Sequence, residues 1–217
     1  DLTPAQAAAC QRIRFARSAS APLPPEHHRA FEARFGISVL EGMGLTECAS
    51  VAFANPLDPG ARKVGSPGRP VGMAARVVAP DGAELGTGER GEIELRGDNV
   101  MTGYHKDPAA TARTLRPGGW LATGDLGYRD ADGFYFITGR LKELIIKGGE
   151  NIAPREIDEA LLAHPAVLEA AAVGLNGDGV EPVSSEIGIA EMAGFVGIVF
   201  ERQRRPAFEH AIHEEFD

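Results

Sequence analysis

The middle of the chain alternates apolar and polar side chains in short runs that are separated by glycine-rich turns. Successive side chains of a strand point to opposite faces, so Arg76–Ala79 and Glu92–Arg96 are predicted to be strands, with Ile93 and Leu95 on one face. Another strand is predicted at Phe134–Thr138, because aromatic and β-branched residues favour strands. Short strands at regular spacing predict a small β-barrel or sandwich here.

The N-terminal third has a helical pattern that leads into a strand. Pro24-Pro25 opens the predicted helix, because proline is tolerated in the first turn, where its missing N–H costs little. Gly36 is the residue expected to end this helix. The side chains predicted to share its apolar face are Ala30, Phe31 and Phe35. A short buried strand is predicted next, at Ile37–Leu40.

This strand is predicted to run into a glycine-rich turn with polar side chains at its tip. The turn consists of Glu41, Gly42, Met43, Gly44, Leu45, Thr46 and Glu47. Glycine lets the backbone approach a ligand closely, while a hydroxyl and a carboxylate can serve phosphate oxygens and Mg²⁺. The turn is therefore a candidate phosphate and metal platform, although a glycine-containing turn with polar tips is as a rule only a turn.

The stretch Gly119–Pro154 combines a predicted hairpin with charged residues at one end of it. The turn signal Asp130–Gly133 reverses the chain and would bring Asp125 and Arg140 toward the same end. Two interpretations fit this pair. The carboxylate could bind the hydroxyls of a ribose, as acidic residues do in other nucleotide-binding folds, or the pair could be a salt bridge that closes the hairpin. The spacing alone favours the salt bridge slightly.

Beyond the hairpin, the pattern predicts a small lobe of helix and strands. Leu141–Ile146 is predicted to be a strand, followed by a tight loop that contains Gly148 and Gly149. A helix is predicted over Pro154–Ala163 and a buried strand over Val167–Leu175.

The last part of the chain has a weaker pattern. A strand is predicted over Phe195–Phe200 and a helix over Pro206–Phe216. Three polar residues of this helix lie close enough for a metal site, but a solvated face is the favoured interpretation; they are His210, His213 and Glu214. Tyr104 and His105 are candidates for a base or a metal ligand, with the same solvated alternative.

Composition and charge exclude several classes of protein. The net charge is −9 with a pI ≈ 5.2, which argues against nucleic-acid binding because that function needs a basic face. No apolar run approaches the roughly 20 residues of a membrane-spanning helix, and the N-terminus has no signal-peptide pattern. Cys10 and Cys48 provide no disulfide framework, so a reducing, cytoplasmic location is predicted.

Several segments together resemble one family of enzymes. They are RSASAPL near the N-terminus, GMGLTE, the TGD that contains Asp125, and GRLKELIIKGGENIAPREID. A match of this length and order is far more specific than a single glycine pattern. The chain is therefore identified as a member of the adenylate-forming enzymes. These comprise acyl-CoA synthetases, including those of fatty acid metabolism, aryl-CoA ligases, luciferases and the adenylation domains of peptide synthetases.

The resemblance implies ATP or AMP, Mg²⁺ and coenzyme A as ligands, and it assigns roles to residues of the GMGLTE segment. Thr46 would contact the α-phosphate, and Glu47 would hold Mg²⁺. Gly42 and Gly44 would lie beside the nucleotide. Met43 stands where the family usually has an aromatic side chain that stacks on adenine, and a thioether covers a purine less rigidly than a ring does.

The hairpin receives its roles from the same resemblance. Asp125 and Arg140 would bind the ribose together, and Ile137 would lie near the adenine. The family uses the end of this hairpin as the boundary between two domains.

The fold implied by the resemblance is α+β, with a β-rich, barrel-like end of a large domain followed by a truncated small lobe. Residues 1–139 would be the C-terminal part of the large AMP-binding domain, and residues 140–217 a partial C-terminal lid domain. Lys142 matches the hinge about which the lid rotates between adenylation and thioester formation. Gly148 and Gly149 would meet the pantetheine arm of coenzyme A.

The resemblance covers about residues 14–175, and residues 176–217 do not match the family. The family's Ser/Thr/Gly-rich loop that ends in Pro-Lys-Gly is not found, and no lysine follows Lys147 to bridge carboxylate and phosphate. The chain also does not begin with methionine. We therefore expect it to be a portion of a longer polypeptide that is not competent for adenylation alone.

The function expected of the whole protein is ATP-dependent ligation of a carboxylic acid to coenzyme A. One alternative is a catalytically inactive remnant with at most nucleotide binding, and another is part of a peptide-synthetase adenylation domain. The acid stays open, because the family forms most of the acyl pocket from segments outside this chain. Neither nucleic acid nor a membrane span is expected, and exposed strand edges predict self-association.

Overall fold

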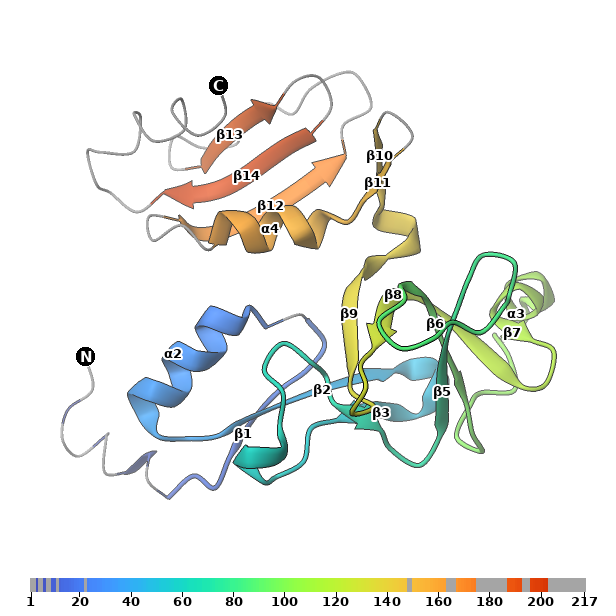
Figure 1. The fold of residues 1–217 in the computed structure, drawn as a ribbon, viewed down its shortest axis with the longest axis horizontal. Coiled ribbons are helices and arrows are strands. Elements are labelled where there is room, and N and C mark those ends of the chain that lie inside the picture. The colour runs from blue at the N-terminus through green and yellow to red at the C-terminus, as the bar shows by residue number, and fades with distance from the viewer. Residues whose placement is uncertain are drawn as a thin grey trace. The chain divides into compact units, whose positions relative to one another are not determined.

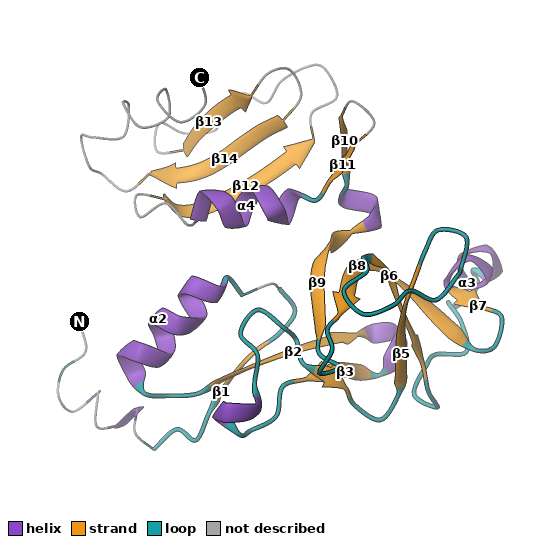
Figure 2. Cartoon of the chain, viewed as in Figure 1, coloured by secondary structure: helices purple, strands orange, loops and turns teal. Residues whose placement is uncertain are grey.

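The computed structural model describes residues 12–21, 23–147, 150–162, 167–174, 187–192 and 196–202, together with residues 3, 6, 9 and 10. The chain divides into two compact units, Asp1–Leu141 and Lys142–Asp217. Each unit combines helix and strands, as Figures 1 and 2 show, so the predicted α+β class is confirmed.

The first unit begins with a sheet whose strand order is β1-β2-β3-β4. β1 (Ala16–Ser18) runs parallel to β2 (Val39–Leu45), and helix α2 (Pro25–Phe35) connects them (Figure 1). β3 (Ser50–Ala54) and β4 (Arg69–Pro70) follow as antiparallel neighbours. The predicted ends of α2 are confirmed, because the helix begins directly after Pro24 and its cap, Gly36, has a left-handed φ of 64°.

The prediction of a turn at residues 41–47 is wrong in its first part, because β2 continues to Leu45. A 3-10 turn, Thr46–Cys48, then leads into β3. The pairing of β2 with β3 requires a glycine at position 44: a Cβ added to Gly44 would lie 1.7 Å from the carbonyl oxygen of Ser50. This glycine therefore allows a close approach of two strands rather than a turn.

The second sheet of this unit has the order β5-β6-β8-β7, and β9 pairs with β8 as well. All of its pairs are antiparallel. Its strands are β5 (Ala74–Val78), β6 (Gly91–Arg96), β7 (Leu115–Arg116), β8 (Trp120–Arg129) and β9 (Tyr135–Arg140), and helix α3 (Pro108–Thr114) precedes β7. β5, β6 and β9 confirm the three strands predicted in this part, with slightly displaced ends.

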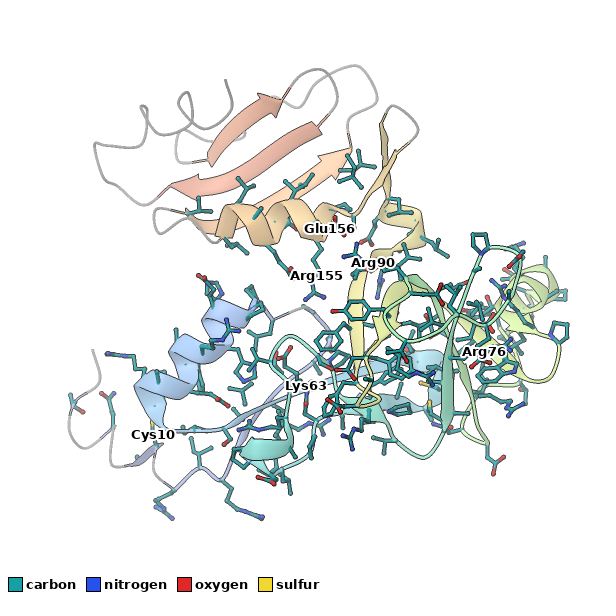
Figure 3. All side chains as sticks on the ribbon, viewed as in Figure 1. Cys10, Lys63, Arg76, Arg90, Arg155 and Glu156 are labelled. Atoms are coloured by element: carbon teal, nitrogen blue, oxygen red, sulfur yellow. The ribbon has the colours of Figure 1, made fainter. Side chains whose placement is uncertain are left out.

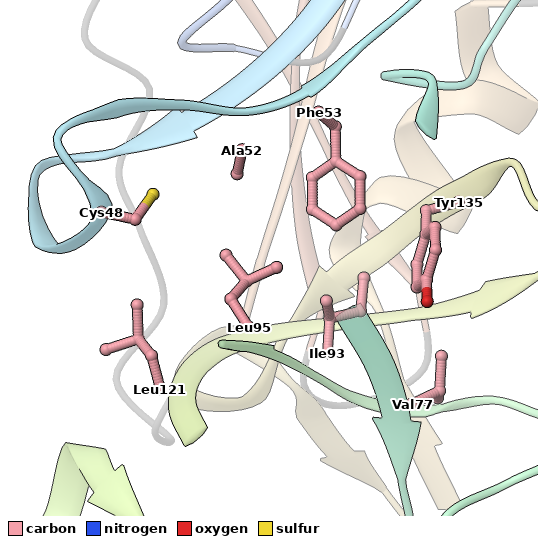
Figure 4. Packing of buried hydrophobic residues seen from close by; sticks show 8 residues of the cluster. All are labelled: Cys48, Ala52, Phe53, Val77, Ile93, Leu95, Leu121 and Tyr135. Atoms are coloured by element: carbon pink, nitrogen blue, oxygen red, sulfur yellow. The ribbon is translucent and has the colours of Figure 1, made fainter. Parts of the chain in front are cut away.

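The apolar core of the first unit lies where the two sheets meet (Figure 4). Its members are Cys48, Ala52, Phe53, Val77, Ile93, Leu95, Leu121 and Tyr135. The ring centroids of Phe53 and Tyr135 are 4.9 Å apart, so the two sheets contact each other through aromatic side chains. Ile93 and Leu95 are both fully buried, which confirms their predicted common face.

Charged side chains join the strands of the second sheet. Glu94 is only 1% exposed and accepts from Arg76 on β5 at 2.7 Å and from Arg116 on β7 at 3.0 Å. Arg76, which Figure 3 labels, and Arg96 lie over the indole of Trp120, with their Cζ atoms 4.1 and 4.6 Å from its centroid. A buried carboxylate between two guanidinium groups is satisfied in this arrangement, which fixes β5, β6 and β7 in register.

Phe31 and Phe35 share one face of α2, as predicted, with ring centroids 4.7 Å apart. Phe31 is nevertheless 36% exposed, whereas His28 is 3% exposed. Nδ1 of His28 lies 2.8 Å from Oε1 of Glu41, and its Nε2 lies 3.3 Å from Oε1 of Glu32. Arg62 contacts the same oxygen of Glu32 at 3.0 Å. A network of charged and polar groups therefore contributes to holding α2 on the unit.

The protonation of Glu32 is expected to affect stability. Partial burial raises the pKa of Glu32, but hydrogen bonds from the Val39 N–H, His28 and Arg62 outweigh this effect and hold the pKa below its ordinary value of 4.5. The unfolded chain then takes up the proton first as the pH falls, so the stabilisation is present above about pH 5 and is lost at lower pH. Glu32→Gln is expected to lower the free energy of unfolding by about 1–2 kcal/mol at neutral pH and by less at about pH 3.5.

Urea unfolding of the wild type and this variant over the same pH range measures the difference. Glu26→Gln removes an exposed carboxylate from the first turn of the same helix and serves as the control, with an expected change below about 1 kcal/mol. A destabilisation by Glu32→Gln that stays constant with pH would contradict this explanation.

The second unit contains the hairpin of β10 (Ile145–Lys147) and β11 (Glu150–Ile152), helix α4 (Pro154–Leu162) and a sheet. The sheet has the order β12-β14-β13, formed by β12 (Val167–Gly174), β13 (Ile187–Met192) and β14 (Val196–Arg202). α4, β12 and β14 confirm predicted elements. The strand predicted at Leu141–Ile146 is wrong at its start, where Leu141–Glu143 forms a 3-10 turn.

The helix predicted at Pro206–Phe216, with its candidate metal ligands, lies outside the described residues. Within the part that the structure describes, no helix is long and apolar enough to cross a membrane. Leu57, Ile13 and Val71 are 59%, 50% and 46% exposed. Self-association through apolar surface stays a prediction.

Candidate functional site

A cleft of about 610 Å³ lies along β2 in the first unit. It is lined by all the residues of the GMGLTE segment except the glutamate, that is, by Gly42, Met43, Gly44, Leu45 and Thr46. Arg17, Ala19 and Ser20 line it too, because β1 runs parallel to β2 and the chain leaves β1 beside these residues. Thr46 is exposed and Met43 is half-buried. The cleft thus offers glycine backbone and hydroxyl groups to a ligand.

A second cavity, of about 300 Å³, shares Leu45 with the cleft. Its wall includes Glu47, Tyr104, Arg113 and Gly124, which come from four different parts of the first unit. The hydroxyl of Tyr104 donates a hydrogen bond of 2.7 Å to Oε1 of Glu47. Thr46 and Glu47 are therefore adjacent in sequence but line different cavities.

Asp125 and Arg140 lie opposite each other in the pairing of β8 with β9, as the hairpin prediction requires. Nε of Arg140 donates to Oδ1 of Asp125 at 2.9 Å. Asp125 is 2% exposed, whereas the side chain of Arg140 is 51% exposed. The salt bridge between Asp125 and Arg140 is thus present, and the guanidinium of Arg140 remains accessible to a ligand. Gly124, the neighbour of Asp125, lines the second cavity together with Glu47.

The other predicted site residues are not gathered at these cavities. Ile137 is partly buried and packs against the apolar core. Lys142 is exposed in the 3-10 turn Leu141–Glu143, at the start of the second unit. Gly148 and Gly149 lie outside the described residues.

The residues present fit a magnesium ion that arrives with a nucleotide. The described residues contain no group of three or more His, Cys, Asp or Glu side chains that could hold a metal ion. Mg²⁺ does not need such a group, because it is usually bound through one or two carboxylates together with substrate phosphates and water. Glu47, half-buried in a cavity wall beside Thr46, supplies a carboxylate of this kind. When bound, the ion would neutralise phosphate charge.

Sequence reasoning missed the partners of two acidic residues. Tyr104 is the hydrogen-bond partner of Glu47, although 57 positions separate them and no local pattern links them. Glu41 turns away from the cleft, and its Oε1 accepts from the N–H of Gly65 at 3.0 Å as well as contacting His28. Only the clustering of these residues in space shows either pairing.

The chain is similar in sequence and structure to known proteins. Residues 2–105 match the family described as AMP-binding enzyme. A sulfoacetate–CoA ligase from Cupriavidus necator is 68% identical over 163 residues, which are 75% of this chain and 32% of that protein. The chain belongs to the AMP-binding enzyme family. This membership confirms the resemblance to adenylate-forming enzymes.

Other AMP-binding enzymes extend the likeness. An oxalate–CoA ligase from Arabidopsis thaliana is 41% identical over 165 residues, 76% of this chain and 32% of that protein. An ATP-bound chimera, RpMatB-BxBclM chimera B3, is 36% identical with a TM-score of 0.80, and the match covers 95% of this chain and 39% of the chimera. The chain thus spans about a third of the length of the curated relatives it matches.

Proposed function

We propose that the polypeptide that carries this chain is an ATP-dependent acid–CoA ligase. It would activate a carboxylic acid as an acyl-adenylate and transfer the acyl group to coenzyme A. The observation that carries the proposal is the 68% identity to a sulfoacetate–CoA ligase over 163 residues. The cleft along β2 supports it, because glycine backbone and a threonine hydroxyl are what a phosphate group requires.

Within this function, the first unit would supply part of the nucleotide site. Thr46 would donate to the α-phosphate, and Glu47 would bind Mg²⁺. Asp125 and Arg140 would bind the ribose hydroxyls through one carboxylate oxygen and the exposed guanidinium. Their close pairing supports this role, because a carboxylate held by a guanidinium stays ionised and oriented.

The second unit would act as the lid. Lys142 would be the hinge, which is supported by its exposed position at the point where the chain divides into two units. Gly148 and Gly149 would approach the pantetheine arm. We propose a cytoplasmic location, where both ATP and coenzyme A are available.

We further propose a small acid with a second anionic group as the substrate class. Nη2 of Arg17 lies 3.6 Å from the position that a Cβ of Gly42 would take, so Gly42 leaves room for this guanidinium in the cleft. Within the described residues, no hydrogen bond or ion pair engages the side chain of Arg17. A guanidinium binds a carboxylate or a sulfonate with two parallel hydrogen bonds. The two named relatives act, by their names, on sulfoacetate and oxalate, which both carry two anionic groups.

Arg17→Gln is expected to reduce kcat/KM for sulfoacetate by about 10–100-fold, because hydrogen bonds to a charged group are lost. The same variant should change kcat/KM for propionate, which has an uncharged tail, by less than about 3-fold. Arg14→Gln removes a nearby exposed arginine and serves as the control. Equal losses for both acids would contradict the proposed substrate class.

Incubation of the polypeptide with ATP, Mg²⁺, sulfoacetate and coenzyme A tests the reaction itself. Chromatography should show AMP and an acyl-CoA, both only when the acid is present. Nucleotide binding without AMP release would instead identify an inactive remnant. An acyl-adenylate that coenzyme A cannot discharge would favour an adenylation domain that serves a carrier protein.

A further inference from the structure

The segment between β6 and α3 is bound to the 3-10 turn that carries Glu47. The N–H of Met101 donates to the carbonyl oxygen of Glu47 at 2.7 Å. Nδ2 of Asn99 donates to the carbonyl oxygen of Cys48 at 2.9 Å. The hydroxyl of Tyr104 donates to the side chain of Glu47 at 2.7 Å. The turn is therefore held by both its backbone and its carboxylate, and the carboxylate contact depends on Tyr104.

The backbone at Tyr104 is itself fixed. Its N–H donates to Oγ1 of Thr111 at 2.9 Å, and this hydroxyl donates to the carbonyl oxygen of Asp107 at 2.8 Å. Asp107 caps α3, because its side chain accepts from the N–H of Ala110 at 2.8 Å. At Gly103, with a φ of +151°, an added Cβ would lie 2.8 Å from Cγ2 of Thr111. The backbone that carries the phenol of Tyr104 is thus held in one conformation.

Tyr104 is the donor in its bond to Glu47, because the phenol O–H donates and a carboxylate oxygen accepts. This hydrogen bond, then burial and the negative charge of Glu47, raise the pKa of Tyr104 above its ordinary value of 10.0, while a hydrogen bond with Thr114 acts in the opposite direction.

We propose that Tyr104 is a positioning residue, which holds Oε1 of Glu47 and thereby directs Oε2 toward the magnesium ion of the nucleotide. The inference rests on the proposed function, because it assigns Glu47 to Mg²⁺. A carboxylate that is free to rotate must lose that freedom when it binds a cation, whereas a carboxylate held by a phenol has already lost it. Groups that orient a metal ligand in this way change metal affinity by about 10–100-fold when removed.

The first arm of the test asks whether the bond exists in solution. The chain contains three tyrosines, so their ring signals can be followed by nuclear magnetic resonance of the labelled full chain at constant pH. Glu47→Gln is expected to shift the ring signals of one tyrosine, and these signals should be missing in Tyr104→Phe. If Glu47→Gln shifts no tyrosine signal, the proposal is overturned.

The second arm measures affinity for ATP with and without Mg²⁺ by calorimetry. Tyr104→Phe is expected to weaken Mg²⁺-ATP binding by about tenfold and to leave binding in EDTA unchanged. Tyr128→Phe removes a phenol that stacks on Phe136 in the same unit, and it should change neither affinity. If Tyr104→Phe binds Mg²⁺-ATP with the wild-type affinity, the positioning role is overturned.

The two arms separate this inference from the proposed function. If the wild-type chain binds no nucleotide while the ring signals of Tyr104 still respond to Glu47→Gln, the nucleotide site is contradicted, and with it the positioning of Mg²⁺. If the chain binds nucleotide but Tyr104 does not respond to Glu47→Gln, only the inference about Tyr104 is contradicted.

Discussion

Gly68→Ala is expected to prevent the first unit from folding stably. A Cβ at this buried position would lie 2.1 Å from both the carbonyl carbon and the carbonyl oxygen of Ala54, and the φ of +106° is itself strained for any residue with a side chain. The clash is with backbone and cannot be relieved by a rotamer change. Gly68 also joins the two sheets, because its carbonyl oxygen accepts from the N–H of Tyr135 at 3.0 Å. The expected loss exceeds about 4 kcal/mol, a large part of the stability of an ordinary domain.

Gly72→Ala is the matched control, because Gly68 lies just before β4 and Gly72 lies just after it. Its φ is +68°, but no atom lies within 4 Å of the added Cβ. Only the left-handed conformation is then penalised, by about 1–2 kcal/mol. Urea unfolding followed by circular dichroism measures both variants. Similar free energies of unfolding for the two would mean that the close contact at Gly68 does not exist.

Asp125→Asn is expected to weaken AMP binding by about 100-fold or more, because the ribose hydroxyls lose a charged acceptor and Arg140 loses its partner. The change is isosteric, so it leaves the volume at this buried position unchanged. Calorimetric titration of AMP into wild type and variant measures the loss. Asp132→Asn, at the exposed turn of the same hairpin, should retain the wild-type affinity.

This experiment also decides between the two interpretations of the Asp125–Arg140 pair. If the pair is only a salt bridge that closes the hairpin, Asp125→Asn lowers the free energy of unfolding but leaves the affinity for AMP unchanged. If it binds the ribose, affinity falls in a chain that is still folded, as the variant's circular dichroism would show.

The sequence predicted the parts of the site that local rules determine. A tight turn at residues 130–133 predicts the β8–β9 hairpin and the end at which Asp125 and Arg140 meet. Their exact pairing also needs a β-bulge between Leu126 and Gly127, which shifts the register and brings Asp125 opposite Arg140. Proline and glycine mark the two ends of α2 for reasons that act within a few residues. The order of motifs was sufficient to identify the family, since no single motif had to be specific.

Contacts between distant segments were beyond such rules. Gly44 looks like a turn glycine in sequence, but its role is set by the backbone of β3, which approaches it closely. The helical pattern of α2 identified the face that Phe31 and Phe35 share, but not the buried position of His28, which depends on the partners that Glu41 and Glu32 offer it. The bond from Tyr104 to Glu47 likewise depends on how the two sheets meet.

The central claim is that the first unit carries part of an adenylate site, formed by the β2 segment and the end of the β8–β9 hairpin. Nuclear magnetic resonance of the labelled chain, titrated with AMP, tests this most directly. The account predicts saturable shifts at the backbone amides of Gly42–Thr46 and at Asp125 and Arg140, while the remainder of the unit is unchanged. A well-dispersed spectrum in which these amides do not respond to AMP would contradict it.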